Sequence, residues 1–248
     1  MSTAPVFVVE SLSEAGAGGL VTLDGAEGRH AVSVRRLRVG EQVVLSDGRG
    51  TGALGTVASV DGRDRLEVAV AELRHEPPPL PSITVVQALP KGDRGELAVE
   101  TMTETGVDRV IPWAAARCVT QWRGERGARA LAKWRATARE AAKQSRRLRI
   151  PEVTEPMTTR QVTAALAGAA FAGVLHEAGA APLAAAELPP GGEIALVVGP
   201  EGGVAPEELA AFEAAGVRPY RLGRTILRTS TAGTAAAALL LTRTGRWA

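Results

Sequence analysis

The chain has 248 residues, of which 45% are apolar and 23% charged, and its formal net charge is +2. These values are typical of a globular protein with a buried core, and they exclude a disordered or fibrous chain. No apolar run is long enough to cross a bilayer and no basic start precedes an apolar leader, so we expect a cytoplasmic protein without membrane contact. The one cysteine excludes an internal disulfide, and the three scattered histidines lack metal-ligand spacing, so we expect no metal.

The small net charge hides two strongly basic segments. Residues 117–149 contain eleven Lys and Arg against two acids, and residues 29–38 contain four arginines, one histidine and no acid. The rest of the chain is left with 14 of the 29 basic residues and 25 of the 27 acidic ones. Two separate basic runs on an otherwise acidic protein favour a polyanionic partner such as a nucleic acid over merely solvated helix faces.

The first part of the chain is predicted to be a small β-barrel over residues 1–75. Short β-branched segments separated by turn residues predict five strands, at 6–9, 19–23, 42–46, 55–60 and 66–70, and residues 27–37 are predicted to form a short helix with His30, Val34 and Leu37 along one side. Gly50, Gly52 and Gly55 have the spacing of a dinucleotide-binding loop. A strand rather than a helix is expected after them, so a hairpin turn is the favoured explanation.

Residues 76–82 are predicted to be a stiff linker, because four of the seven are prolines. After them the pattern alternates between strand and helix up to residue 248, which predicts an α/β domain with a mostly parallel sheet over 83–248. Strands are expected at 83–89, 107–113, 171–176 and 194–198, helices at 96–104, 128–148 and 160–166, and a short helix or a loop at 181–187. In the helix over 128–148, Leu131, Trp134, Ala138, Ala141, Ser145 and Leu148 form one stripe, basic residues occupy the other faces, and Pro151 ends the helix.

Two loops near the end of the chain predict a ligand site. Gly199, Gly202 and Gly203 follow the apolar strand at 194–198, and Pro206 begins a helix. A second loop starts at Leu222, after another strand and before the last helix. The carboxyl ends of parallel strands meet at one edge of a sheet, where open α/β sheets bind their ligands. These loops offer main-chain groups and apolar walls, which suit an adenine ring, and they lack the lysine of a phosphate loop.

The order of several motifs resembles one known family. Gly199-Pro-Glu-Gly-Gly and Ile226-Leu-Arg-Thr are the two most specific, and further matches lie at 29–37, 46–50, 87–94, 100–106, 116–119, 139–147 and 150–151. Over nearly its whole length the chain resembles the RsmE family of 16S ribosomal RNA methyltransferases, which belong to the SPOUT superfamily.

The resemblance implies a PUA-like RNA-binding β-barrel and a SPOUT α/β domain with a deep trefoil knot, a rare exception to the rule against knots. It also implies a homodimer that uses S-adenosyl-L-methionine to methylate N3 of the uridine conventionally numbered 1498 in the 16S rRNA of the 30S ribosomal subunit. Three loops would hold the cofactor through Leu175, His176, Glu177, Gly199, Pro200, Glu201, Gly202, Gly203, Leu222, Gly223, Ile226, Leu227, Arg228 and Thr229.

Two residues are candidates for the chemistry. Removal of the N3 proton leaves negative charge on the uracil carbonyl oxygens, and Arg228 is our candidate to stabilise it, with a phosphate contact as the alternative. Glu201 is a weaker candidate, as the base or as the residue that orients Arg228, with a structural hydrogen bond within its own loop as the alternative. Contacts with RNA are expected from a basic set whose alternative is surface solvation: His30, Arg35, Arg36, Lys91, Arg94, Arg117, Lys143, Arg146 and Arg147.

Other functions stay open at this point. A SPOUT methyltransferase could act on another RNA site, in tRNA or on a ribose 2′-OH. A non-catalytic ribosome-assembly protein that binds RNA could keep the same fold, although the intact glycine loops argue against it.

Overall fold

The computed structural model describes residues 4–12 and 16–247, and these residues form two compact units. The N-terminal unit extends to Pro78 and also includes Ala142–Ile150, while the C-terminal unit comprises Pro79–Ala141 and the chain from Pro151 onward. The division predicted from the sequence was linear. It did not include the later segment Ala142–Ile150 in the N-terminal unit, and we call this segment the return segment.

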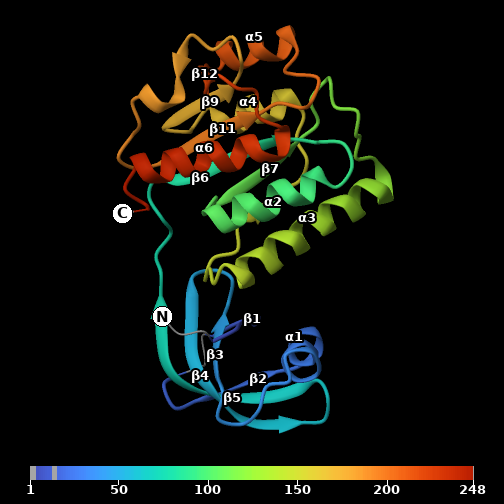
Figure 1. The fold of residues 1–248 in the computed structure, drawn as a ribbon, viewed down its shortest axis with the longest axis vertical. Helices are drawn as coiled ribbons and strands as arrows, with labels where there is room; N and C mark the ends of the chain where they lie inside the picture. Colours follow the sequence, from blue (N-terminus) through green and yellow to red (C-terminus); the bar gives the residue numbers. More distant parts are fainter. Residues whose placement is uncertain (1–3, 13–15, 248) are drawn as a thin grey trace. The chain divides into compact units, whose positions relative to one another are not determined.

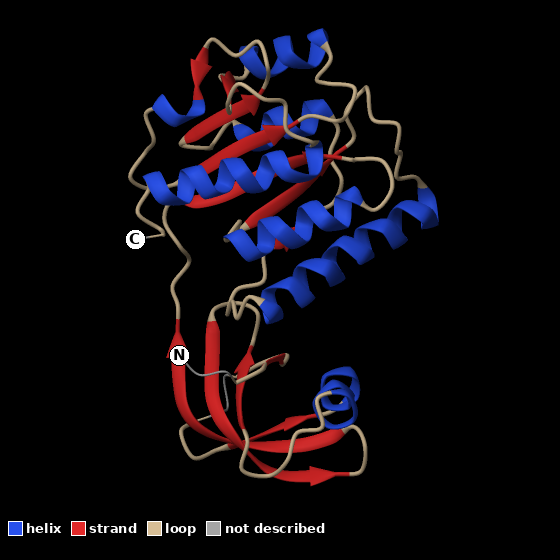
Figure 2. Cartoon of the chain, viewed as in Figure 1, coloured by secondary structure: helices blue, strands red, loops and turns tan. Residues whose placement is uncertain are grey.

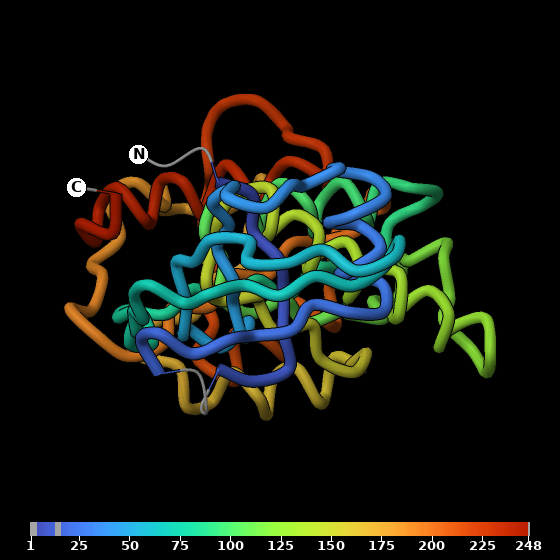
Figure 3. The backbone as a smooth tube through the Cα atoms, turned by 90° about the horizontal axis from the view of Figure 1, so that it is seen from below, coloured from blue at the N-terminus to red at the C-terminus, as the bar shows by residue number. Residues whose placement is uncertain are grey.

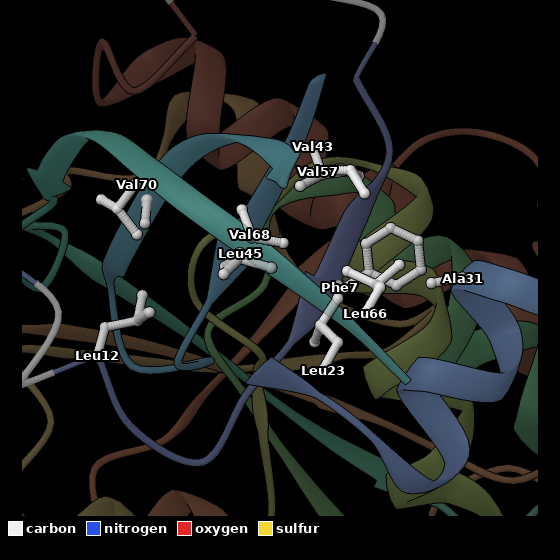
Figure 4. Close-up of a cluster of buried hydrophobic side chains, with 11 residues drawn as sticks. Phe7, Leu12, Leu23, Ala31, Val43, Leu45, Val57, Leu66, Val68 and Val70 are labelled. Atoms are coloured by element: carbon white, nitrogen blue, oxygen red, sulfur yellow. The ribbon is translucent and has the colours of Figure 1, made fainter. Parts of the chain in front are cut away.

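The N-terminal unit is built on a sheet of five strands in the order β1-β3-β4-β5-β2 (Figures 1 and 2). The strands are β1 (Val6–Val8), β2 (Leu20–Leu23), β3 (Gln42–Ser46), β4 (Thr51–Asp61) and β5 (Arg65–His75). All five predicted strands are present, and β4 and β5 are longer than expected. Leu66, Val68 and Val70 alternate along β5 and point into a core that also contains Phe7 and Leu45 (Figure 4).

The helix predicted at 27–37 is shorter and less regular than expected. It consists of α1 (Gly25–Arg29) and one π-helical stretch, His30–Val34, and Arg36 then adopts a left-handed φ of 55°. Val34 is 66% exposed, so the expected row of His30, Val34 and Leu37 is not a buried face. Only the ends of that row pack inward, His30 edge-on against Phe7 and Leu37 against the core.

The glycines at 50–55 serve close packing and not a dinucleotide. Strand β4 starts at Thr51, as predicted, and no helix follows these glycines. A Cβ atom at Gly52 would lie 2.7 Å from Cδ2 of Leu148, so any larger residue would displace this leucine of the return segment.

The long basic helix α3 (Gly124–Gln144) ends earlier than predicted. Leu131, Trp134, Ala138 and Ala141 are buried as expected, but the helix does not continue to Leu148. Arg146 has a left-handed φ of 59°, and the carbonyl of Leu148 accepts hydrogen bonds from Ser46 Oγ and the Gly50 N–H, both at 3.0 Å. Bonds to the barrel have therefore replaced the last helical turn.

The C-terminal unit contains a seven-stranded sheet in the order β10-β12-β9-β11-β6-β7-β8, and every pair in it is parallel. Its strands are β6 (Ser82–Ala88), β7 (Arg109–Trp113), β8 (Glu152–Val153), β9 (Phe171–Leu175), β10 (Ala181–Pro182), β11 (Glu193–Val198) and β12 (Arg218–Arg221). The predicted α/β class is confirmed. Residues 181–187, predicted as a helix or loop, form β10 and a single 3-10 turn, Leu183–Ala185.

Helices cover both faces of this sheet (Figures 1 and 2). They are α2 (Arg94–Thr105), α3, α4 (Thr159–Leu166), α5 (Pro206–Ala214) and α6 (Thr229–Arg243). Gly233 of α6 lies against Val85 of β6, whereas Trp113 of β7 packs edge-on against Phe212 of α5 at 5.3 Å between ring centroids. Val85 and Trp113 point to opposite faces, so α6 and α5 are on opposite sides of the sheet. The knot stays a prediction.

None of the helices in the described ranges is long and apolar enough to cross a membrane.

Candidate active site

Three loops surround one cavity at the carboxyl edge of the parallel sheet. They follow the neighbouring strands β9, β11 and β12, and the third, residues 222–228, leads into α6. Figure 3 shows this third loop as a red arch that stands out from the strand before it. The cavity has a volume of about 1060 Å³. All fourteen residues predicted to hold the cofactor line it, so the structure brings them together, while their contact with a cofactor stays a prediction.

The glycine loop, Gly199–Gly203, is fixed by tight backbone contacts. A Cβ atom at Gly199 would lie 2.9 Å from Cγ2 of Val204, and Gly203 has a left-handed φ of 73°. The carbonyl of Gly202 accepts a hydrogen bond of 3.1 Å from the guanidinium of Arg117. The loop therefore presents its main chain to the cavity in one defined conformation.

A buried carboxylate, Glu208, holds the segments next to this loop in place. One oxygen of Glu208 accepts hydrogen bonds from the Ala116 N–H and the Thr159 hydroxyl, both at 2.8 Å, and the other accepts from the Ala205 N–H at 3.2 Å. Glu208 thus ties the start of α5 to the residue that precedes Arg117. Nothing in the sequence around Glu208 indicated its two distant partners, Ala116 and Thr159.

The charge of the cavity wall is mostly positive. Arginines 94, 117, 221, 224 and 228 line it against Glu177 and Glu201, which gives five positive and two negative side chains. A concave surface with a formal charge of +3 attracts an anion. Arg94 and Arg117 belong to the predicted RNA-binding set, and here they stand at the same cavity as the predicted cofactor loops.

Arg228 is the residue that directly precedes α6. Its backbone carbonyl accepts hydrogen bonds from the N–H groups of Thr231 and Ala232, both at 2.9 Å, so its main chain is held by the first turn of the helix. Its side chain is exposed, and among the described residues its guanidinium forms no salt bridge. A fixed backbone with an available cation suits a contact with a second reactant.

Glu201 has a different partner from the one considered. Its Oε1 atom accepts from the guanidinium of Arg94 at 3.4 Å and from the Lys91 N–H at 3.2 Å. The idea that Glu201 orients Arg228 is therefore wrong for this structure, and so is a bond confined to its own loop. The carboxylate connects the glycine loop to the start of α2.

The structure also separates the predicted RNA-binding residues by their surroundings. Lys91, Arg35, Arg36 and Arg146 are exposed, whereas His30 and Arg147 are half-buried. Lys143 is the exception, because its side chain is only 7% exposed and its ammonium lies 3.0 Å from Glu27 Oε1 and 3.4 Å from His30 Nδ1. Lys143 is thus an internal ion-pair partner within the N-terminal unit and not the surface contact that the sequence suggested.

Comparison with known proteins agrees with this architecture. Residues 76–241 match the model of an RNA methyltransferase domain, and residues 23–71 match that of an RNA methyltransferase PUA domain. A ribosomal RNA small subunit methyltransferase E from Mycobacterium bovis is 46% identical and covers 98% of this chain and 94% of its own length. The protein of that name from Bacillus subtilis is 30% identical, with 85% of both chains covered.

A solved structure shares the fold of the whole chain. It is a ribosomal RNA small subunit methyltransferase E from Neisseria gonorrhoeae bound to S-adenosyl methionine, with a TM-score of 0.87, 28% identity, and coverage of 97% of this chain and 98% of the other. Family models that span both units and relatives that match almost end to end leave one conclusion. The chain belongs to the RsmE family of RNA methyltransferases.

Proposed function

We propose that this protein transfers a methyl group from S-adenosyl-L-methionine to N3 of a specific uridine in the ribosomal RNA of the small subunit. One observation carries the proposal: three loops at the carboxyl ends of β9, β11 and β12 enclose a single cavity whose wall is rich in arginine. The comparisons support it, since relatives are called ribosomal RNA small subunit methyltransferases and a similar solved structure is bound to S-adenosyl methionine.

The cavity fits the cofactor. Its volume of about 1060 Å³ is at the upper end of the range of roughly 300–1000 Å³ for ligand sites, which leaves room for a second reactant. Leu175, Val198 and Leu222 provide apolar walls for a purine ring, and the glycine loop brings main-chain groups within reach. When bound, S-adenosyl-L-methionine supplies an electrophilic methyl group.

The residues of the chain stabilise the uracil base as it reacts. The uracil N3 atom carries a proton on its Watson–Crick edge, so the base must be unpaired before it can enter the cavity. Loss of that proton places negative charge on the two carbonyl oxygens. The guanidinium of Arg228 is positioned to donate hydrogen bonds to such an anion, because it lines the cavity from a backbone fixed at the start of α6.

The role of Glu201 is to hold Arg94 at the cavity. Its carboxylate accepts hydrogen bonds from the Arg94 guanidinium and from the Lys91 N–H, so it is engaged at the start of α2. Arg94 is 39% exposed in its side chain, so it can contact an RNA phosphate while Glu201 fixes its direction.

Within the N-terminal unit, the return segment adds the end of the second basic run to the first basic run. The buried pair of Lys143 and Glu27 joins α1 to the return segment, with His30 beside it. Arg35 and Arg36 of the first run and Arg146 and Arg147 of the second therefore belong to one unit. We assign these four arginines to RNA phosphates, and Lys91, Arg94 and Arg117 to the same task in the C-terminal unit.

The family resemblance extends the proposal to a homodimer that acts on the 30S subunit. A methylation assay tests the whole proposal: the purified protein receives S-adenosyl-L-methionine and either unmethylated 30S subunits, free 16S rRNA or tRNA, and the products are digested and separated by mass. We expect N3-methyluridine in the small-subunit RNA. Methyl transfer to tRNA or to a ribose 2′-OH, or a protein that does not bind the cofactor, would overturn the proposal.

A further inference from the structure

A chain of buried hydrogen bonds lies behind the cavity. Gln87 lies near the carboxyl end of strand β6, and its Nε2 donates a hydrogen bond of 2.9 Å to Thr229 Oγ1. Thr229 Oγ1 in turn donates to the carbonyl of Gly199 at 2.8 Å. Gln87 is fully buried and Thr229 is 5% exposed, so water does not compete for these bonds. The three residues come from β6, α6 and the glycine loop.

The packing of α6 on β6 determines why these groups meet. Gly233 lies against Val85, because a Cβ atom there would be 3.3 Å from Cγ1 of the valine. Two residues along a strand and four residues along a helix each cover roughly 6 Å. One turn back along α6, Thr229 therefore reaches Gln87, and the two contacts keep the helix in register with the strand.

The hydroxyl of Thr229 has no capacity left to donate to a ligand. It carries one hydrogen, which goes to Gly199, and it accepts from Gln87. Its neighbour Arg228 ends the exposed loop at 222–228, and its acceptor Gly199 begins the glycine loop. One hydroxyl thus connects two of the three walls of the cavity.

The fold alone does not require an amide at position 87. Gln87 Oε1 is buried and, within the described part of the chain, has no hydrogen-bond partner. Such an orphan acceptor is unfavourable, and an apolar side chain of similar size would fill the space without it. The amide nitrogen of Gln87 also donates to the Ala88 carbonyl at 3.1 Å, which fixes its position. This fixed donor orients the Thr229 hydroxyl toward Gly199.

We infer that Gln87 and Thr229 are positioning residues that set the distance between the glycine loop and the loop of Arg228. The inference rests on the proposed function, since it assigns these residues to the binding of S-adenosyl-L-methionine. Without the hydrogen bonds from Gln87 to Thr229 and from Thr229 to Gly199, nothing fixes the distance between the two loops.

Steady-state kinetics on five variants tests the inference. Thr229→Val keeps the shape of the side chain and removes the hydroxyl, Gln87→Met removes the donor at similar volume, and Thr229→Ser restores the hydroxyl. We expect Thr229→Val and Gln87→Met each to raise the KM for S-adenosyl-L-methionine about tenfold, and Thr229→Ser to stay within about twofold of wild type. The double variant Gln87→Met with Thr229→Val should show about the same tenfold increase in this KM, because both changes break the same chain of hydrogen bonds.

Thr234→Val is the matched control. Its hydroxyl lies on the same helix and bonds to Thr101 Oγ1 at 2.7 Å, away from the three loops. We expect a lower Tm for this variant with an unchanged KM for the cofactor.

The outcomes separate the inference from the proposed function. A wild-type protein that gives no heat of binding with S-adenosyl-L-methionine in calorimetry contradicts the proposed function itself. Binding by wild type together with an unchanged KM in Thr229→Val and Gln87→Met, or with a multiplicative effect in the double variant, overturns the positioning role alone. An equal rise of KM in Thr234→Val would also overturn it. If Thr229→Val does not fold, Gln87→Met and Thr229→Ser decide.

Discussion

Arg228 and Glu201 stand at the same cavity, but their neighbours give them different tasks. The guanidinium of Arg228 is exposed at the start of α6, whereas the carboxylate of Glu201 is held by Arg94 and the Lys91 N–H. The first is available to a reacting base and the second is already engaged. Their substitutions should therefore affect different kinetic constants.

Arg228→Ala should lower kcat by about 10²–10³-fold, because it removes a donor aimed at charge that develops only in the transition state. The Kd of S-adenosyl-L-methionine, measured by calorimetry, should change by less than about threefold. Arg218→Ala is the control, since Arg218 is exposed at the opposite end of β12. A kcat for Arg228→Ala equal to that of the control would rule out the assigned role.

Glu201→Gln and Glu201→Ala distinguish a positioning carboxylate from a base. Glutamine keeps an acceptor for Arg94 and Lys91, so we expect kcat within about fivefold of wild type, while alanine should raise the KM for RNA by about tenfold. The assay is methyl incorporation with RNA as the varied substrate. Loss of kcat by orders of magnitude in Glu201→Gln alone would identify Glu201 as the proton acceptor.

Cys118 should be inert in the folded protein. Burial raises the pKa of its thiol, so the reactive thiolate is scarcer at pH 8 than for a free cysteine. We expect a thiol reagent to modify native protein far more slowly than protein unfolded in guanidinium chloride. Equal rates in the two states would show that the thiol is accessible.

Two of the three cavity loops were predictable from glycines that follow parallel strands at one edge of the sheet, whereas the loop at 175–177 was expected only from the family resemblance. Their partners were not. Arg94 is 107 residues from Glu201 along the chain, and Gln87 is 142 residues from Thr229, so no local pattern connects them. The register of β6 beside β11 brings Arg94 near Glu201, and the packing of α6 on β6 brings Thr229 to Gln87.

At the scale of the elements, α3 shows where periodicity stops being informative. The spacing of Leu131, Trp134, Ala138 and Ala141 predicted the body of the helix and its buried face. Leu148 fits the same spacing, but its packing on Gly52 and its carbonyl bonds to the barrel override the helical pattern. The end of the helix depends on a contact about one hundred residues away, which a helical repeat does not encode.

Lys143→Met should destabilise the N-terminal unit by about 3 kcal/mol, because it removes the ammonium that lies 3.0 Å from the largely buried carboxylate of Glu27. The measurement is equilibrium unfolding in urea. Lys133→Met is the matched control on the same helix, since the Lys133 side chain is 64% exposed in its pair with Glu96 and should contribute less than about 1 kcal/mol.

The double variant Glu27→Gln with Lys143→Met should regain part of the lost stability, because the amide still accepts from the Val8 N–H. Equal stabilities of Lys143→Met and Lys133→Met would contradict the account of the return segment.

For the whole molecule, the sequence predicted a β-barrel followed by an α/β domain, but it did not predict which residues belong to each compact unit. Alternating strands and helices made the parallel sheet predictable after the prolines, and the turn spacing did the same for the barrel. The return of residues 142–150 to the N-terminal unit was not predictable, because the groups that hold it, such as Glu27, Ser46 and Gly52, are about one hundred residues away along the chain. This return places the last arginines of the second basic run, Arg146, Arg147 and Arg149, in the same unit as the first run.

The measurement that tests the central claim most directly is mass spectrometric mapping of small-subunit rRNA from cells that lack the gene for this protein. The proposed function predicts that N3-methyluridine is absent from that RNA, that the wild-type gene restores it, and that a gene carrying Arg228→Ala restores little of it. Small-subunit rRNA that retains its full N3-methyluridine in the deletion strain would contradict the claim.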